Sequence, residues 1–155
     1  MGSNFTLELA DEAATLAFGA ALSKALVPSL TIYLHGDLGA GKTTLVRGLL
    51  HALGHAGKVK SPTYTLVETY MLSHYNLHHF DLYRFNDDEE WEAAGFRDYF
   101  NEQSVCMIEW PEKAAHVLPV ADINVSLSIQ GAGRHATFEA STELGQQSLE
   151  RMKSI

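Results

Sequence analysis

Residues 36–43 read Gly36-Asp37-Leu38-Gly39-Ala40-Gly41-Lys42-Thr43, which fills every fixed position of the pattern G-x-x-x-x-G-K-[ST]. An apolar run ending Ile32-Tyr33-Leu34 precedes the stretch, and an amphipathic segment, Thr44 to Leu53, follows it. A glycine-rich loop between a strand and a helix can direct backbone N–H groups and the positive end of the helix at phosphate oxygens. A glycine-rich turn without a ligand is the alternative, but the strand and the helix are the context that a phosphate-binding loop requires. The sequence therefore predicts such a loop at residues 36–43.

Two side chains of this loop carry the expected chemistry. Lys42 is expected to be exposed and to reach the β and γ phosphates of a nucleoside triphosphate, and we place it among the candidate catalytic residues. The hydroxyl of Thr43 is suited to Mg²⁺, which prefers oxygen ligands and keeps bridging phosphates as partners. The predicted nucleotide-binding residues of the loop are Gly36, Asp37, Leu38, Gly39, Ala40, Gly41, Lys42, Thr43 and Thr44.

Hydrophobic periodicity predicts alternating helices and strands along the rest of the chain. Asp11 is a suitable N-cap for a helix that runs to about Leu26. The other expected helices span residues 42–54, 89–94 and 142–152, and the expected strands span 30–34, 77–83, 104–110, 123–129 and 135–140, with 61–70 passing from loop into strand. A Gly-containing turn at 130–133 joins the last two strands as a hairpin. We therefore expect one α/β domain, residues 1–155, with a P-loop NTPase-like three-layer fold, a mixed, largely parallel sheet and a C-terminal β-hairpin.

Composition limits the class of partner. Lys and Arg number 11 against 19 Asp and Glu, which gives a formal net charge of −8, and no basic run is present. Tight unaided binding of RNA or DNA is therefore not expected. No stretch approaches the roughly 20 apolar residues needed to cross a bilayer, and the single cysteine, Cys106, lies in an apolar run and is interpreted as a small buried hydrophobe. We expect a soluble, cytoplasmic protein without a membrane or DNA partner.

Two acidic residues stand at the ends of predicted strands, where such folds place their chemistry. Glu109 directly follows the buried run Val105 to Ile108, which is the position of a carboxylate that holds Mg²⁺ from the side opposite Thr43. Asp81 could orient or deprotonate an attacking water, or bind the water shell of the metal. A structural carboxylate that caps a turn is the alternative interpretation of Asp81.

The segment between the loop helix and the next strand contains Thr63, at a place where nucleotide switches carry a threonine that senses the γ-phosphate. The histidines do not predict a zinc site. His51 and His55 have helical spacing, but a glycine ends the helix between them, and His78 and His79 point to opposite faces of a predicted strand. Thr63 is therefore the candidate switch residue of this region.

Four segments, in this order and spacing, resemble the TsaE family, formerly called YjeE. They are Gly-Asp-Leu-Gly-Ala-Gly-Lys-Thr-Thr (36–44), Ser-Pro-Thr-Tyr-Thr-Leu-Val-Glu (61–68), His-Phe-Asp-Leu-Tyr-Arg (79–84) and Ile-Glu-Trp-Pro-Glu (108–112). The first is shared by very many proteins, whereas the other three in combination are specific. The resemblance runs from Leu9 to the hairpin that ends near Phe138.

The resemblance implies an ATPase subunit of the bacterial machinery that forms N6-threonylcarbamoyladenosine (t6A) next to the anticodon of tRNAs reading codons that begin with A. It implies ATP and Mg²⁺ as cofactors and the TsaB–TsaD heterodimer as partner, with tRNA met only through that complex. ATP hydrolysis would then support multiple turnover and not the carbamoyl transfer itself.

The resemblance also assigns roles to single positions of this chain. It gives Lys42 and Thr43 to phosphate and Mg²⁺, Glu109 to Mg²⁺, and Asp81 to catalysis. It gives switch-like or partner-facing roles to Thr63 and Trp110. Glu12 and Arg134 align with positions that contact the nucleotide.

Two alternatives share the phosphate loop. A small-molecule kinase would need several cations around a transferring phosphoryl group. The candidates Arg84 and Arg97 are isolated in the sequence, which argues against a kinase. A non-catalytic switch that docks on a partner when loaded with nucleotide uses the same parts as a slow ATPase.

Overall fold

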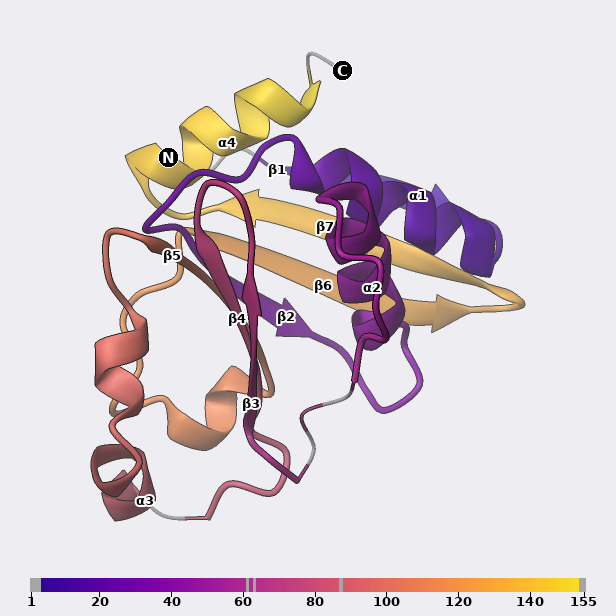
Figure 1. The fold of residues 1–155 in the computed structure, drawn as a ribbon. Coiled ribbons are helices and arrows are strands. Elements are labelled where there is room, and N and C mark those ends of the chain that lie inside the picture. The colour runs from indigo at the N-terminus through magenta and orange to yellow at the C-terminus, as the bar shows by residue number, and fades with distance from the viewer. Residues whose placement is uncertain (1–3, 61, 63, 87, 154–155) are drawn as a thin grey trace.

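The computed structural model describes residues 4–60, 62, 64–86 and 88–153. A seven-stranded mixed sheet runs through it, with the strand order β1-β7-β6-β2-β5-β4-β3 (Figure 1). The four central strands β6, β2, β5 and β4 run parallel to one another, whereas β7 pairs antiparallel with β6 and β1, and β3 pairs antiparallel with β4. The strand bounds are β1 (Asn4–Leu9), β2 (Thr31–His35), β3 (Val67–Met71), β4 (Asn76–Asp81), β5 (Ser104–Glu109), β6 (Ile123–Gln130) and β7 (Gly133–Ala140).

Helices connect these strands. Their bounds are α1 (Glu12–Ser23), α2 (Lys42–Ala52), α3 (Asp88–Ala93) and α4 (Glu143–Lys153), with short 3₁₀ helices η1 (Phe96–Tyr99) and η2 (Pro111–Ala114). The predicted N-cap is confirmed, because Asp11 Oδ1 accepts the backbone N–H of Ala14 at 2.9 Å. Within the described part of the chain, none of these helices combines the length and apolar character needed to cross a membrane.

Two apolar clusters on opposite faces of the sheet make the fold three-layered. Along β5, Val105 and Met107 pack with residues of α1, α2 and α4, whereas Cys106 and Ile108 pack with residues of α3, η1 and η2. Every residue of β5 is buried because both faces of the strand are covered. The predicted α/β fold with a parallel centre and a hairpin of β6 and β7 is therefore confirmed.

Helices α1 and α2 cross at unusually short range. A Cβ on Gly19 of α1 would lie 2.1 Å from the carbonyl oxygen of Leu45, and a Cβ on Gly48 of α2 would lie 2.3 Å from that of Leu16. Glycine at both positions therefore lets the two backbones touch. This contact fixes the helix that follows the phosphate loop against the middle of α1.

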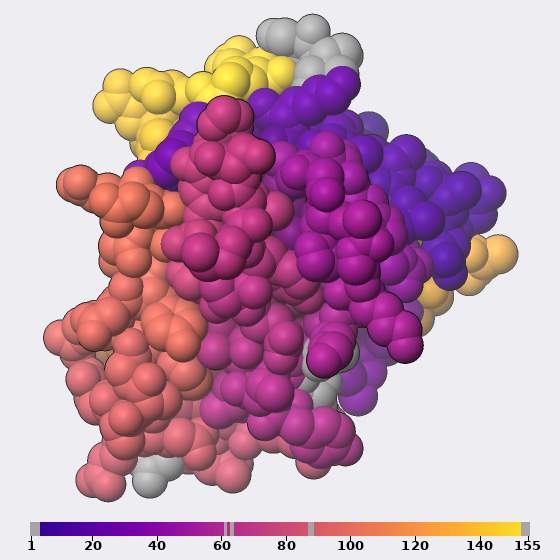
Figure 2. Space-filling model, viewed as in Figure 1, coloured from indigo at the N-terminus to yellow at the C-terminus, as the bar shows by residue number. Residues whose placement is uncertain are grey.

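The β3–β4 hairpin covers the front of the molecule. It lies between α2 and the segment that contains α3 and η1 (Figures 1 and 2). Strand β4 pairs in parallel with β5, so that Asp81 stands directly beside Glu109 in the register. The two acidic strand ends thus meet at one edge of the sheet.

The element bounds differ from the sequence-based expectation by one to three residues, and one strand was missed. Strand β1 was not predicted, although it pairs over its full length with β7 and stacks Phe5 on Phe138 at 5.3 Å. Helix α1 ends at Ser23, before the predicted Leu26, and the next N–H groups, those of Lys24 and Ala25, bond to carbonyls three residues back, as in a tightened last turn. Strand β4 ends at Asp81, because its carboxylate accepts the N–H of Tyr83 and turns the chain.

Candidate functional site

The loop from Gly36 to Gly41 leaves β2 and enters α2 in the conformation that its glycines predict. Gly39 and Gly41 have φ angles of 82° and 103°, a region that residues with a side chain rarely adopt. A Cβ on Gly39 would meet no atom within 4 Å, so the φ angle and not a lack of space requires glycine here. The space beside the loop stays open. The backbone therefore curls as a phosphate-binding loop requires.

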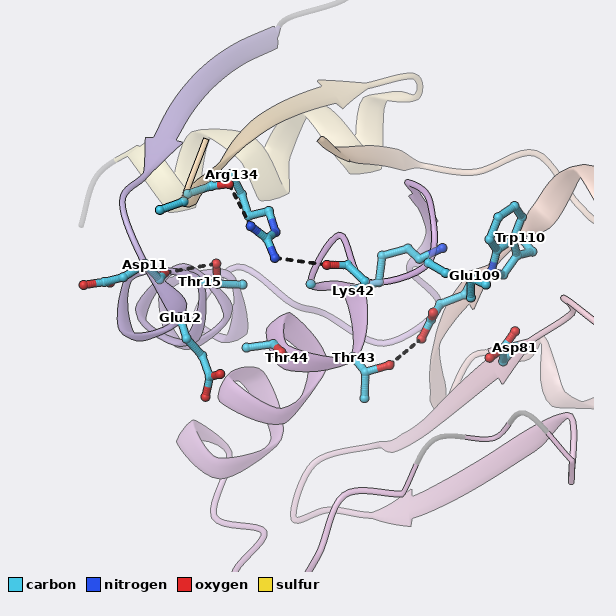
Figure 3. A pocket seen from close by; sticks show the side chains of 15 residues that line it. Asp11, Glu12, Thr15, Lys42, Thr43, Thr44, Asp81, Glu109, Trp110 and Arg134 are labelled. Atoms are coloured by element: carbon cyan, nitrogen blue, oxygen red, sulfur yellow. Dashed lines mark hydrogen bonds between the residues drawn. The ribbon is translucent and has the colours of Figure 1, made fainter. Parts of the chain in front are cut away.

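A pocket of about 490 Å³ opens at this loop (Figure 3). Its walls come from the phosphate loop, the start of α1, the ends of β4 and β5, and the turn before β7. The predicted site residues that line it are Glu12, Leu38, Gly39, Gly41, Lys42, Thr43, Thr44, Asp81, Glu109, Trp110 and Arg134. Gly36, Asp37 and Ala40 belong to the loop but not to the lining, and Thr63 lies outside the described residues.

Lys42 is buried, which contradicts the expectation of an exposed loop lysine. Its side chain folds back across the loop, where Nζ donates a hydrogen bond to the carbonyl of Gly36 and lies 4.1 Å from the ring centroid of Trp110. Burial lowers the pKa of Lys42, and the nearby carboxylate of Glu109 opposes this shift. The amine is thus held by a carbonyl and an aromatic face at the mouth of the loop.

Glu109 receives hydrogen bonds from two elements. The hydroxyl of Thr43, at the start of α2, donates to Oε2 at 3.4 Å, and Nε2 of His79 on β4 lies 2.6 Å from the same oxygen. Figure 3 shows the bond from Thr43 to Glu109. With the His79 contact, the helix start and the neighbouring strand converge on the carboxylate at the end of β5. A hydroxyl and a carboxylate are the oxygen ligands that Mg²⁺ prefers, so this pair fits a magnesium ion bound with phosphates and water.

Asp81 has a structural contact and a place in the pocket. Its Oδ1 accepts the backbone N–H of Tyr83 at 3.0 Å, and the side chain lines the pocket one strand away from Glu109. The structure therefore confirms that Asp81 caps a turn. It does not remove the catalytic prediction, because a carboxylate has further lone pairs to offer a water in the pocket.

Arg134 and Glu12 flank the opposite side of the pocket (Figure 3). Arg134 donates to the carbonyls of Ala40 and Gly39, each at 3.1 Å, and so braces the loop from β7. Glu12 is exposed and pairs with Arg47 of α2 at 3.1 Å. An exposed pair of this kind contributes about 0–1 kcal/mol, so the Glu12 side chain can exchange it for another partner.

Trp110 follows β5 with a φ angle of 59°, a left-handed conformation that is rare for a bulky residue. Its ring lies over Lys42 on one side and 5.0 Å from the ring of Tyr83 on another. The indole N–H is buried and finds no hydrogen-bond partner among the described residues. Strained backbone of this kind concentrates at functional sites, where the surrounding structure holds it in place.

The sequence interpretation missed His79, which contacts Glu109, and the pocket-lining residues Asp11, Thr15, Ala132 and Gly133. The sequence excludes His79 as a zinc ligand but does not predict its contact with Glu109. A signal was present, because His79 shares a strand face with Asp81 and both belong to the segment His-Phe-Asp-Leu-Tyr-Arg. Among the described residues, no group of three or more His, Cys, Asp or Glu side chains is placed to hold a metal ion.

Comparisons with known proteins show which family this chain resembles. The family model "Threonylcarbamoyl adenosine biosynthesis protein TsaE" matches residues 9–136. The chain is 48% identical over 147 residues to the tRNA threonylcarbamoyladenosine biosynthesis protein TsaE of Haemophilus influenzae, covering 92% of this chain and 93% of that protein. It is 37% identical over 114 residues to the protein of the same name from Bacillus subtilis, covering 73% and 71% of the two chains.

A solved structure gives the same result for the fold. The crystal structure of YdiB from Bacillus subtilis superposes with a TM-score of 0.85 at 26% sequence identity, covering 99% of this chain and 97% of the other. The shared fold and the match over the phosphate loop, β4 and β5 therefore lead to one conclusion. This chain belongs to the TsaE family of tRNA threonylcarbamoyladenosine biosynthesis proteins.

Proposed function

We propose that the protein binds ATP with Mg²⁺ in this pocket and hydrolyses it in support of t6A formation on tRNAs that read codons beginning with A. One observation carries the proposal. Lys42, Thr43, Glu109 and Asp81 line a single pocket at the phosphate loop although they come from α2, β5 and β4. The TsaE family supports the pathway, and the motif resemblance supports TsaB–TsaD as the partner.

The proposed reaction divides the work among these side chains. The loop N–H groups and Lys42 would hold the phosphates, and Thr43 and Glu109 would hold Mg²⁺ from two sides. Bound Mg²⁺ supplies positive charge at the β and γ phosphates. Asp81 would orient the attacking water or accept its proton.

A nucleotide-dependent docking switch is the second candidate, and one observation favours it. Lys42 lies against Trp110, Trp110 against Tyr83, and Nζ of Lys113 lies 5.9 Å from the Tyr83 ring centroid, so that the loop lysine is linked to side chains at the surface. Single-turnover phosphate release, measured with and without the TsaB–TsaD heterodimer, separates the two candidates. Phosphate release in either condition supports an ATPase. The absence of release in both conditions supports a docking switch that does not hydrolyse ATP.

Nucleotide binding is tested with Lys42→Ala against Lys58→Ala, which removes an exposed lysine outside the pocket. Calorimetric titration with ATP and Mg²⁺ should show binding for the wild type and Lys58→Ala, and a loss of binding or of turnover for Lys42→Ala. Because Lys42 is buried, a thermal melt is needed to show that the variant is folded. Unchanged ATP turnover in a folded Lys42→Ala protein would overturn the assignment.

The partner is tested by titrating the TsaB–TsaD heterodimer into labelled protein with ATP or without nucleotide. Tighter association with ATP is expected, since Trp110 contacts the lysine that would hold the phosphates. Equal affinities with ATP and without nucleotide would contradict a nucleotide-dependent switch. Tight tRNA binding by the isolated chain would contradict the argument from its net charge of −8.

A further inference from the structure

The proposed reaction gives Glu109 a role at Mg²⁺ but gives none to His79, with which Glu109 forms a buried pair. The His79 side chain is fully buried, the Glu109 side chain is 5% exposed, and Nε2 and Oε2 are 2.6 Å apart. An ionised carboxylate only accepts hydrogen bonds, so His79 donates its Nε2–H to Glu109. A charge-assisted bond of this length between buried groups restricts the rotation of both side chains.

The register explains how the contact arises. Asp81 stands beside Glu109 in the parallel pairing of β4 and β5, and His79 lies two residues earlier on the same strand face. The His79 side chain therefore reaches along that face to Oε2. Thr43 donates to the same Oε2 from the pocket side, so the carboxylate is held between the sheet and the phosphate loop.

We propose that His79 is a positioning residue that holds the Glu109 carboxylate in the orientation needed for Mg²⁺. The inference rests on the proposed function, because Glu109 is a magnesium ligand only if the nucleotide binds with its metal. A carboxylate fixed before the metal arrives does not lose side-chain entropy when it binds. Removing the hydrogen-bond partner of a metal ligand commonly weakens metal affinity or activity by about 10- to 100-fold.

The adjacent histidine provides a matched comparison. His78 is also buried on β4, but it points to the other face, where Nδ1 lies 2.8 Å from the Thr69 hydroxyl and Nε2 lies 3.2 Å from the Ser104 hydroxyl. It does not line the pocket. A substitution at His78 therefore disturbs the same strand without touching Glu109.

The test measures ATP affinity across a series of Mg²⁺ concentrations, and again in EDTA, for His79→Ala, His79→Gln and His78→Gln. We expect His79→Ala to need about 10- to 100-fold more Mg²⁺ while its metal-free affinity stays at the wild-type value. His79→Gln should recover most of the loss, because its amide nitrogen can occupy the place of Nε2 and donate to Oε2. His78→Gln should keep the wild-type magnesium dependence.

Each outcome has a defined meaning. Wild-type magnesium dependence in His79→Ala, no recovery in His79→Gln, or an equal shift in His78→Gln overturns the inference. A wild type that fails to bind ATP refutes the proposed function instead, and the role of His79 falls with it.

A second measurement does not depend on the variants folding. The Nε2–H proton of His79 should give a downfield resonance in the NMR spectrum of the wild-type protein without nucleotide. It should shift when ATP and Mg²⁺ are added together, and less when ATP is added in EDTA. No resonance, or equal shifts in both conditions, would refute the positioning role.

Discussion

Replacing Gly48 with alanine should loosen the helix that carries Lys42 and Thr43. Gly48 lies within α2 where that helix crosses α1, and a Cβ there would stand 2.3 Å from the carbonyl oxygen of Leu16 and 2.8 Å from its Cα. Both neighbours are backbone atoms of α1, so no side-chain rotation can relieve the clash. The helices must move apart, and the phosphate loop moves with α2.

Two opposing effects decide whether Gly48→Ala raises or lowers the free energy of unfolding. Alanine favours a helix interior over glycine by about 0.5–1 kcal/mol. Ordinary van der Waals contact begins at 3.4 Å, so a Cβ on residue 48 at 2.3 Å would lie 1.1 Å too close to the carbonyl oxygen of Leu16. Overpacking of this kind costs about 1–3 kcal/mol. We expect the clash to win by about 1–2 kcal/mol, which lowers Tm by about 2–8 °C for a domain of this size.

Thermal and urea denaturation followed by circular dichroism measure the effect, with Gly57→Ala as the control. Gly57 lies in an exposed loop, and a Cβ there would meet only the side chain of His55, at 3.3 Å. The control should stay close to the wild-type Tm, and Gly48→Ala should also bind ATP more weakly. A Gly48→Ala protein that melts at or above the wild-type temperature would refute the close helix crossing.

Three further outcomes are expected. Thr43→Ala should raise the Mg²⁺ concentration needed for ATP binding in calorimetric titrations; unchanged dependence would place the metal elsewhere. Asp81→Asn should keep ATP affinity within a few-fold but slow hydrolysis by roughly 10²-fold or more, because the amide can cap the turn but cannot accept the proton. Equal losses of affinity and rate would instead make Asp81 a binding residue. Burial raises the pKa of Cys106 to about 12, so its thiol should react with Ellman's reagent at pH 8 only after urea unfolding; rapid reaction of the native protein would contradict the buried β5.

The sequence predicted the parts of the fold that depend on local pattern. The phosphate loop is set by glycine spacing, and Glu109 was placed at a strand end because an apolar run precedes it. Asp81 was placed near the end of the strand predicted at residues 77–83. The neighbouring positions of the two acids follow from the parallel pairing of β4 and β5, which the α/β pattern implies. Spacing and periodicity were therefore enough for the fold class and for the wall of the pocket that carries the acids.

The missed features depend on tertiary contacts that no local pattern contains. Strand β1 is defined by its pairing with β7, more than a hundred residues away along the chain. Lys42 is buried because Trp110, in a left-handed conformation after β5, covers its amine. The contact of His79 with Glu109 needs the exact offset of two strands, since a shift of one residue would turn the histidine to the other face.

The position of Lys42 gives a physical reason for Trp110 to respond to the nucleotide. In the proposed reaction the amine must exchange the Gly36 carbonyl, and part of its contact with Trp110, for phosphate oxygens. A partly desolvated cation–π contact is worth about 0.5–2 kcal/mol, and a hydrogen bond to a charged group about 1.5–3 kcal/mol. Charge-assisted bonds to phosphate offset these losses for Lys42 but not for Trp110. Trp110 has a left-handed backbone and an indole N–H without a partner among the described residues, and it would then lose a neighbour. The proposed binding of ATP would therefore change the free energy of the Trp110 side chain.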